Sequence, residues 1–368
     1  MKRTVLILAN NSDGLYGFRK ELLKQLSATD TIYVVVPDNG YFSELRDIGC
    51  TVIETPVDRR GMNPILDLKL FWRYRRILRE VSPDLVITYT IKPNIYGGLA
   101  CRLAHVPYAV NITGLGSAIE NGGLLRHFVL ALYRPALKKA RVVFFENAGN
   151  RDTLVATGVV PPGRDVVLNG AGVNLEDYPY QPYPAKGEPV RFLFVGRVMR
   201  EKGVDEFFDA AGRMKREFGS RAEFHMVGSF EEGYKPVMDR LEQEGVVRYH
   251  GYQSDMRSVY AAAHCVVLPS YHEGMSNVLL EAAASGRPLI TSNIPGCREA
   301  VEEGVTGFLC QPRDAEALYQ AMRRFLMLPE EQRADMGRRG RERMRRRFGK
   351  EKIVESTISQ LGVAAYER

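Results

Sequence analysis

Short runs of β-branched and aromatic residues recur along the chain, and each is followed by a segment whose apolar residues have helical spacing. The predicted strands of the first half are residues 5–9, 32–36, 85–89, 109–112 and 142–145. Strands that read as unbroken apolar runs between helices are typical of parallel sheets covered on both faces. This pattern constrains the chain more than any other feature, because it predicts an α/β fold with doubly wound sheets.

The pattern starts again after residues 178–189, where prolines and a glycine exclude both a helix and a central strand. The predicted strands of the second half are residues 192–195, 224–227, 265–268 and 288–290. A chain of 368 residues accommodates two domains of roughly 100–200 residues each. We therefore expect two Rossmann-like domains, residues 1–180 and 181–349. Ligands of such folds bind beyond the carboxyl ends of the strands, so we expect a site in a cleft between the domains.

Composition excludes several classes of protein. With 45% hydrophobic and 26% charged residues, the chain is not disordered. Its five cysteines lack any C-x-x-C pair, which indicates neither a disulfide framework nor a zinc cluster and favours a reducing compartment. No apolar run approaches the ~20 residues that span a bilayer, and the first run is too short for a signal peptide. We therefore expect a cytoplasmic protein, whose net charge of +7 suits several anionic partners.

A glycine and two cations open the second domain, in the segment Phe-Val-Gly-Arg-Val-Met-Arg-Glu-Lys-Gly at residues 194–203. Gly196 ends a predicted strand, and Arg197 and Lys202 follow on the loop. Glycine permits a tight backbone turn, and two cations on one loop can converge on an anion such as a diphosphate. Taken alone, the segment also fits an exposed basic turn.

A second motif, residues 272–281, follows a predicted strand of the same domain. Ser276 or Asn277 is a suitable helix N-cap, so the backbone amides at the start of this helix are expected to point at an anion. Glu281 then lies about one turn into the helix, where a carboxylate accepts hydrogen bonds from ribose hydroxyls. Glu273 precedes the helix, where it is placed to hold a sugar. The alternative is that both glutamates are solvent-exposed charges with no ligand, as most pairs of glutamates are.

These elements, together with residues 292–299, resemble the retaining glycosyltransferases of family 4, and the resemblance extends over essentially the whole chain. It implies the GT-B fold, in which two Rossmann-like domains face a central cleft. Residues 88–97 and 111–116 resemble the acceptor halves of bacterial enzymes that build capsule, O-antigen or N-glycan precursors on a polyprenyl diphosphate. The resemblance thus implies an acceptor-binding first domain, onto which a C-terminal helix at 350–368 packs back, and a donor-binding second domain.

The resemblance also implies roles for single residues. Arg197 and Lys202 bind the donor diphosphate and Glu273 contacts the donor sugar, so that these three are the expected catalytic residues. The backbone at Tyr252 faces the nucleobase, while Gly14 lies under the diphosphate on a loop at residues 10–17. The expected donor site comprises Gly14, Gly196, Arg197, Lys202, Gly228, Tyr252, His272, Glu273, Gly274, Met275, Ser276, Asn277, Val278 and Glu281.

Acceptor contacts are expected in the first domain at Lys92, Asn94, Thr113 and Gly114. Lys92 and Asn94 are placed to bind the acceptor diphosphate at a strand-to-helix turn, although a polar loop that caps the next helix fits the same residues. The chain departs from the family pattern in this domain. Several members carry a histidine just after the strand at 109–112, where this chain has none. A catalytic histidine is therefore not expected there.

The chain contains no Asp-x-Asp motif, with which many glycosyltransferases hold a metal ion on the leaving diphosphate. Arg197, Lys202 and a helix N-terminus supply the same charge stabilisation. We therefore expect no cofactor, no metal and a UDP-sugar as co-substrate. Because no protein nucleophile is evident, retention predicts front-face substitution, in which the departing phosphate oxygen takes the acceptor proton.

Residues 66–79 combine the only tryptophan with five basic residues on a helical pattern. Such a helix is typical of membrane interfaces, where aromatic rings reach the headgroups and cations meet anionic lipid. The expected membrane contacts are Trp72, Arg73, Arg75 and Arg76, and residues 124–139 form a second candidate helix. Packing on the sheet of the first domain is the alternative for both. We predict peripheral association with the inner face of the cytoplasmic membrane.

The leading hypothesis is transfer of a hexose or N-acetylhexosamine, of the GalNAc, Gal or GlcNAc type, from a UDP-sugar to an undecaprenyl-diphosphate-linked saccharide. A UDP-sugar 2-epimerase of the same architecture is the alternative. A dinucleotide-dependent oxidoreductase is disfavoured because no G-x-G-x-x-G follows the first strand. An arginine-rich stretch at 338–347 suggests nucleic-acid binding, but no recognised module accompanies it, and no nucleic-acid partner is expected.

Overall fold

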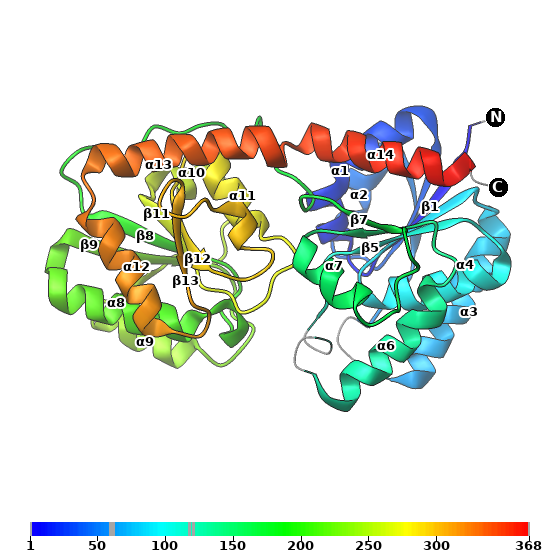
Figure 1. Ribbon diagram of the computed structural model, residues 1–368, viewed down its shortest axis with the longest axis horizontal. Helices are drawn as coiled ribbons and strands as arrows, with labels where there is room; N and C mark the ends of the chain where they lie inside the picture. Colours follow the sequence, from blue (N-terminus) through cyan, green and yellow to red (C-terminus); the bar gives the residue numbers. More distant parts are fainter. Residues whose placement is uncertain (1, 59–62, 117–118, 120–121, 367–368) are drawn as a thin grey trace. The chain divides into compact units, whose positions relative to one another are not determined.

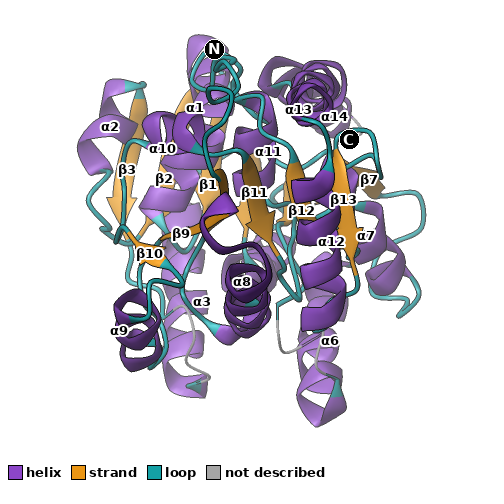
Figure 2. Cartoon of the chain, turned by 90° about the vertical axis from the view of Figure 1, so that its left-hand side faces the viewer, coloured by secondary structure: helices purple, strands orange, loops and turns teal. Residues whose placement is uncertain are grey.

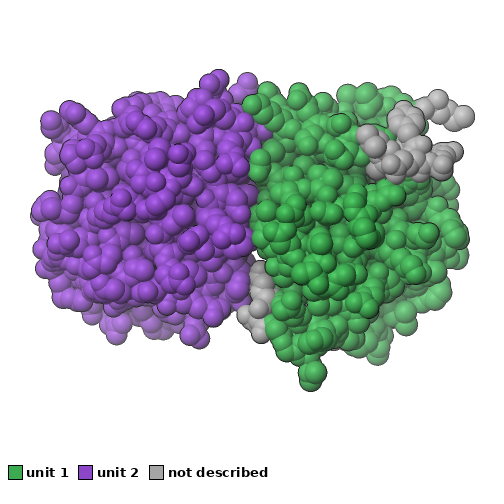
Figure 3. All heavy atoms as spheres, in the orientation of Figure 1, with its two compact units in different colours: residues 1–171, 350–368 green, residues 172–349 purple. Residues whose placement is uncertain are grey.

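A computed structural model describes residues 2–58, 63–116, 119 and 122–366. The chain divides into two compact units, the first formed by residues 1–171 and 350–368 and the second by residues 172–349 (Figure 3). No helix of the described residues is long and apolar enough to span a membrane. All five cysteines are free and buried.

The division between the units falls at residues 171 and 172, before the predicted position at 180 and 181, because the proline-rich segment packs on the second unit. The buried guanidinium of Arg287 donates hydrogen bonds to the carbonyl oxygens of Gln181 and Pro182, at 2.6 and 2.7 Å. Arg341 donates likewise to the carbonyl oxygen of Tyr178. Hydrogen bonds from charged donors to buried carbonyls are among the stronger ones in proteins, so this segment is part of the second unit.

The first unit is built on a sheet of seven parallel strands in the order β3-β2-β1-β4-β5-β6-β7 (Figure 1). The strands are β1 (Thr4–Leu8), β2 (Thr31–Val36), β3 (Cys50–Glu54), β4 (Leu85–Tyr89), β5 (Tyr108–Ile112), β6 (Val142–Phe145) and β7 (Asp165–Val167). The helices are α1 (Ser12–Thr29), α2 (Phe42–Asp47), α3 (Pro64–Val81), the π-helical turn η1 (Pro93–Gly97), α4 (Gly98–Ala104), α6 (Gly123–Leu137), α7 (Ala148–Val155) and α14 (Lys350–Tyr366).

Helices cover both faces of this sheet, which explains why its strands read as apolar runs. One face packs against α3, α4 and α6, with Tyr74 and Tyr133 among the buried residues. The other face packs against α1 and the last helix, α14, through Leu23 and Leu361. Figure 1 shows α14 beside α1. The start of α14 is fixed by Lys350, whose ammonium group donates to the carbonyl oxygen of Phe18 at 3.1 Å.

The second unit has a sheet of six parallel strands in the order β10-β9-β8-β11-β12-β13, of which Figure 2 shows β11, β12 and β13 side by side. The strands are β8 (Val190–Val195), β9 (Ala222–Val227), β10 (Arg248–Tyr249), β11 (Cys265–Leu268), β12 (Leu289–Ser292) and β13 (Gly307–Cys310). The helices are η2 (Arg200–Lys202), α8 (Val204–Phe218), η3 (Gly219–Arg221), α9 (Lys235–Gln243), α10 (Met256–Ala262), α11 (Asn277–Ala284), η4 (Arg298–Ala300), α12 (Ala315–Met327), α13 (Glu330–Arg343) and η5 (Met344–Phe348).

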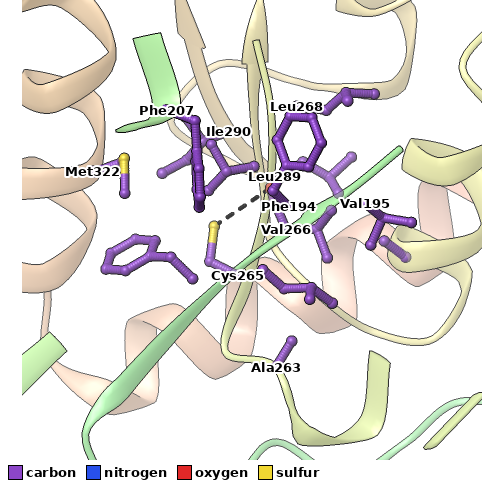
Figure 4. Close-up of a cluster of buried hydrophobic side chains, with 14 of the residues drawn as sticks. Phe194, Val195, Phe207, Ala263, Cys265, Val266, Leu268, Leu289, Ile290 and Met322 are labelled. Carbon is purple, nitrogen blue, oxygen red and sulfur yellow. Dashed lines mark hydrogen bonds between the residues drawn. The ribbon is translucent and has the colours of Figure 1, made fainter. Parts of the chain in front are cut away.

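The core of the second unit includes the contact between its sheet and α8 and α12 (Figure 4), and Leu279 and Leu280 of α11 are buried in the same cluster. Phe194 of β8 meets Phe207 of α8 with ring centroids 5.4 Å apart, and Met322 of α12 is fully buried in the same cluster. Aromatic pairs at this separation add to the free energy gained by burying their area. This core fixes β8 and β11 side by side, with Cys265 paired to Phe192.

Candidate functional site

Each sheet contains one point at which its strand order reverses, and ligands of doubly wound folds bind at the carboxyl ends of the strands there. In the second unit, this point lies between β8 and β11. The loop after β8 carries Gly196, Arg197 and Lys202, and the loop after β11 carries His272 and Glu273. The two sequence motifs therefore leave the same edge of one sheet.

Glycines allow the loops at this edge to lie in backbone contact. A Cβ atom added at Gly228 would lie 1.8 Å from the carbonyl oxygen of Gly196, which no side chain permits. Gly203, with φ of +74°, packs on the loop after β11, because its Cβ would lie 2.1 Å from the carbonyl oxygen of Pro269. The loop that carries Lys202 therefore lies directly on the loop that leads to Glu273.

The centre of the candidate site is an ion pair between these loops. The ammonium group of Lys202 lies 2.5 Å from Oε1 of Glu273, and the two side chains are only 17% and 13% exposed. The hydroxyl of Ser270, which is fully buried, donates to the same oxygen at 2.9 Å. Sequence reasoning found Lys202 and Glu273 but missed Ser270, whose only signal is its place directly after a buried strand.

The helix that follows, α11, begins as the sequence predicts, with Ser276 as its N-cap. The amide of Ser276 donates to the carbonyl oxygen of Gly296 at 2.9 Å, so this amide is used within the protein, and the anion site expected here is left to the amides of Asn277 and Val278. Met275 is 5% exposed and its side chain belongs to the hydrophobic core, so the predicted contact of this residue with the donor is left to its backbone. The helix N-terminus stays the predicted anion site.

Arg197 forms an ion pair of its own, separate from the Lys202–Glu273 pair. Its guanidinium group donates to both carboxylate oxygens of Glu231, at 3.0 and 2.9 Å, and its side chain is 45% exposed. An exposed ion pair of this kind contributes little stability, so an anionic ligand can exchange with the carboxylate at low cost. Glu231 was missed by sequence reasoning, because nothing in the sequence links it to Arg197.

The residues expected near the nucleobase lie at the ends of β9 and β10. The amide of Gly228 donates to the carbonyl oxygen of Gly251 at 2.9 Å, and the hydroxyl of Tyr249 donates to the carbonyl oxygen of Gly228 at 2.6 Å. The side chain of Tyr252 is exposed. These hydrogen bonds join the loop after β10 to the loop after β9.

A buried network holds the residues just before Glu273. The amide of Tyr271 donates to the carbonyl oxygen of Glu201 at 2.9 Å, and its hydroxyl donates to Glu206 at 2.7 Å. Burial and the Glu206 carboxylate raise the pKa of Tyr271 to about 12. Burial and the nearby Arg313 lower the pKa of His272, so that this imidazole is neutral near pH 7.

Glu281 lies on α11 against two tyrosines. The hydroxyl of Tyr260 donates to its Oε2 at 3.0 Å. Burial raises the pKa of Tyr178, and the charge and hydrogen bond of Glu281 add to this effect. Glu281 is therefore half-buried and oriented by aromatic neighbours, rather than a freely solvated helix charge.

In the first unit, Gly14, which the resemblance places under the donor diphosphate, does not lie on a loop. Gly14 occupies the first turn of α1, which begins at Ser12. The predicted loop at 10–17 is wrong because Ser12 is buried and exchanges hydrogen bonds with Asn39, at 2.9 and 3.3 Å. This exchange fixes the start of the helix earlier than the glycines suggest.

The acceptor candidates of the first unit include one residue that is buried inside the protein and three that are not. Asn94 is 1% exposed, and its amide bridges Thr88 and the carbonyl oxygen of Asn111 at 2.7 and 2.9 Å, so the prediction that it binds a ligand directly is corrected to an internal role. Lys92 forms an ion pair with Asp67 at 2.7 Å. Thr113 and Gly114 follow β5 and are half-buried.

The predicted membrane helix α3 packs on the core through Leu70, Tyr74 and Ile77, and only its other face is exposed. Arg73 is exposed and turns back toward β3, where it donates to the hydroxyl of Thr55 at 3.0 Å and to the carbonyl oxygen of Glu54; its contact with lipid stays a prediction. Arg75 is half-buried, and Arg76 pairs with Glu80 at 2.7 Å. The exposed apolar side chains of α3 and α6, which we call the α3–α6 apolar surface, are Ile65, Leu66, Leu68, Trp72, Leu124, Leu125 and Phe128.

Two models of glycosyltransferase families match the chain. The model of the glycosyl transferase 4-like domain matches residues 20–170, and the model of glycosyl transferases group 1 matches residues 189–327. Together they match most of the chain, one model in each unit. The chain therefore belongs to this family of glycosyltransferases.

Curated relatives agree with this membership. One is the N,N'-diacetylbacillosaminyl-diphospho-undecaprenol alpha-1,3-N-acetylgalactosaminyltransferase of Campylobacter jejuni, 29% identical over 84% of this chain and 86% of the relative. Another is the UDP-Gal:alpha-D-GlcNAc-diphosphoundecaprenol alpha-1,3-galactosyltransferase of Escherichia coli, 26% identical over 79% of each chain.

Solved structures show the same fold. HepE of Anabaena, in complex with UDP and glucose, aligns with a TM-score of 0.81 at 18% identity, covering 98% of this chain and 100% of its own. Sucrose-phosphate synthase of Thermosynechococcus elongatus aligns with a TM-score of 0.80 at 19% identity, covering 99% and 100%. The two Rossmann-like units are thus those of the GT-B fold, as the sequence predicts.

Proposed function

We propose that this glycosyltransferase moves a hexose or N-acetylhexosamine from a UDP-sugar to an undecaprenyl-diphosphate-linked saccharide, with retention at the anomeric carbon. The observation that carries the proposal is the Lys202–Glu273 pair at the carboxyl edge of β8 and β11. The relatives supply the substrate class, because the two named above act on diphospho-undecaprenol-linked sugars.

Charge on the leaving group is balanced by protein cations in this proposal. Lys202 and Arg197 neutralise the donor diphosphate, and the amides at the start of α11 bind one of its phosphates. Arg197 reaches the diphosphate by exchanging its exposed partner, Glu231. We propose that these groups suffice without a metal ion.

Glu273 and Glu281 bind the two sugar rings of the donor. Glu273 accepts hydrogen bonds from the hydroxyls of the transferred sugar, and Glu281 accepts them from the ribose. Both carboxylates are held by neighbouring donors, Lys202 and Tyr260, and are therefore preorganised before the donor binds.

Retention follows from the front-face mechanism. The acceptor hydroxyl attacks from the side on which the diphosphate leaves, and the departing phosphate oxygen takes its proton. The names of both relatives describe alpha-1,3 products, and an alpha product from an alpha-linked donor is retention. The protein stabilises charge and holds the two substrates in place.

The first unit binds the acceptor in this proposal. Lys92 lies after β4, next to the reversal of strand order between β1 and β4, and it is the cation we assign to the acceptor diphosphate. Its ammonium group keeps Asp67 as a partner, whose other oxygen accepts from Tyr96 at 3.0 Å. Thr113 and Gly114 border the same edge after β5.

A lipid-linked acceptor favours contact with a bilayer, and we place that contact at the cytoplasmic face of the inner membrane. The α3–α6 apolar surface includes Leu124 and Phe128, which are 90% and 58% exposed. Beside it, a groove of about 620 Å³ is lined by Arg126, His127 and Arg134. Apolar side chains next to cations match the acyl boundary and the anionic headgroups of a membrane surface.

The membrane contact is tested by sedimentation with vesicles that contain phosphatidylglycerol. We expect Leu124→Ser with Phe128→Ser to reduce the bound fraction severalfold, because exposed apolar area is lost without a change in the core. Met327→Ser removes an apolar side chain of similar exposure from the second unit and is the matched control. Equal sedimentation of the native protein and the double variant would refute this contact.

The reaction is tested by UDP release from a panel of UDP-sugars in EDTA, with and without short-chain polyprenyl-diphosphate-linked saccharides. The proposal predicts release that needs both one donor and the lipid acceptor, and an alpha linkage in the product. A UDP-sugar that changes its own stereochemistry without an acceptor would establish the 2-epimerase instead. Activity that EDTA abolishes and a divalent cation restores would overturn the metal-independent mechanism.

A further inference from the structure

We propose that Ser270 is a positioning residue, which orients the carboxylate of Glu273 toward the transferred sugar. This inference rests on the proposed function, in which Glu273 binds that sugar. It adds a residue that neither motif contains.

The contact geometry singles out Ser270. Its side chain is fully buried two residues after the end of β11 and three residues before Glu273. Its hydroxyl donates to Oε1 of Glu273 at 2.9 Å, and the ammonium group of Lys202 approaches the same oxygen at 2.5 Å. Two donors of different kinds thus converge on one carboxylate oxygen.

The two donors differ in what happens to them when a donor substrate binds. The Lys202 ammonium group carries three N–H bonds and is attracted to a diphosphate, so the ligand competes with Glu273 for it. The Ser270 hydroxyl is buried and uncharged, and a diphosphate does not compete for it. Ser270 therefore keeps Oε1 in place while Lys202 turns to the phosphates, and the second carboxylate oxygen is left to the sugar hydroxyls.

The backbone around Ser270 is held by other contacts. Tyr271 is fixed through Glu201 and Glu206, and Gly296 packs behind Glu273, because a Cβ at Gly296 would lie 2.6 Å from the carbonyl oxygen of Glu273. Loss of the Ser270 hydroxyl therefore frees a side chain, and the loop that carries it stays in place.

The test compares UDP with the UDP-sugar that the native protein binds, by calorimetry in EDTA. We expect Ser270→Ala to weaken UDP-sugar binding about tenfold or more, as for one hydrogen bond to a charged group, and to leave UDP affinity within about twofold. Ser270→Thr retains the hydroxyl and is expected to bind both ligands as the native protein does. Ser292→Ala, which removes a buried hydroxyl beside Cys310, is the matched control and is expected to change neither affinity.

A double-mutant cycle shows whether Ser270 acts through Glu273. In the background of Glu273→Gln, Ser270→Ala should weaken UDP-sugar binding by less than about twofold more. An equal loss of UDP and UDP-sugar affinity in Ser270→Ala would show a merely structural role and overturn the proposal, as would unchanged UDP-sugar affinity. A native protein that binds UDP but no UDP-sugar would instead overturn the proposed function itself.

Discussion

Single residues carry most of the chemistry proposed here, and Gly14 shows how structure changes a prediction at this scale. In the first turn of α1, a Cβ at Gly14 has its nearest neighbour at 3.6 Å and meets no clash. Alanine is favoured over glycine within helices by roughly 1 kcal/mol. Gly14→Ala is therefore expected to fold like the native protein. Its turnover should be lower, because the proposed diphosphate approaches the backbone at this position.

The measurement compares turnover and thermal stability for Gly14→Ala and Gly17→Ala. Gly17 lies on the same helix, is exposed and has no neighbour within 4 Å of an added Cβ, so it gains helix stability without facing a ligand. We expect at least a tenfold loss of turnover for Gly14→Ala alone, with both variants at least as stable as the native protein. Equal turnover in the two variants would remove Gly14 from the donor site.

The glycine at position 228 has the opposite character, because its role is in the fold. An added Cβ would lie 1.8 Å from the carbonyl oxygen of Gly196, and the backbone has φ of +148°. We expect Gly228→Ala to lower the free energy of unfolding by about 3 kcal/mol or more, as overpacking against backbone does not relax. Denaturant titration checks this, and a stability within 0.5 kcal/mol, on the order of a surface change, would contradict the geometry.

At the scale of elements, Asn94 joins β4, β5 and η1 through its side-chain amide. Its removal leaves buried polar groups of Thr88 and Asn111 without this partner, and each such group costs about 1–3 kcal/mol. We expect Asn94→Ala to be destabilised by about 2–4 kcal/mol in chemical unfolding. A variant of native stability with weaker acceptor binding would restore the direct ligand role that the sequence suggests.

The sequence predicts central strands far better than edge strands. β4, β6 and β11 have the predicted bounds because they are fully buried and read as continuous apolar runs. The four edge strands, β3, β7, β10 and β13, were not predicted. The first three are partly exposed, whereas β13 is mostly buried but has only four residues, and β10 has only two residues. Nothing within so short a segment distinguishes a strand from a loop; only its pairing with β9 does.

The site residues whose role follows from their residue type could be predicted from the sequence. Those whose role depends on packing could not. Lys202 and Glu273 were found from charge and glycine spacing, and the structure brings them together. The contacts of Arg73 with Thr55 and Glu54 were not predicted, because a helical pattern does not say which side chains turn back to a strand. Ser270 carries only the weak signal of its place after a buried strand.

At the scale of the whole molecule, pH dependence of stability should be strongest in the second unit. His264 is 2% exposed, and its Nδ1 accepts from the amide of Arg191 at 3.1 Å. Burial, with smaller effects of nearby arginines, lowers the pKa of His264 to about 3. Between its ordinary pKa of about 6.5 and 3, the unfolded chain binds a proton that the folded chain does not. Stability therefore falls as the pH falls through this range.

The loss amounts to up to about 2 kcal/mol at pH 5, from 1.36 kcal/mol for each pH unit below 6.5. We expect His264→Asn, which keeps an acceptor for the Arg191 amide, to remove most of this acid sensitivity. The loss of stability is measured by hydrogen exchange of the amides of β8 and β11 at pH 7.5 and 5, corrected for intrinsic exchange rates. The same acid dependence in both proteins would assign the effect to other groups.

The affinity for UDP tests the central claim most directly, because the claim is that the cationic edge of the second unit binds the donor diphosphate. In EDTA, we predict that Lys202→Ala weakens UDP binding about 10- to 100-fold, as for a lost charge-assisted hydrogen bond. Lys235→Ala, at an exposed lysine of α9, should bind UDP like the native protein. UDP affinity unchanged by Lys202→Ala, or lost equally in both variants, would contradict this account of the site.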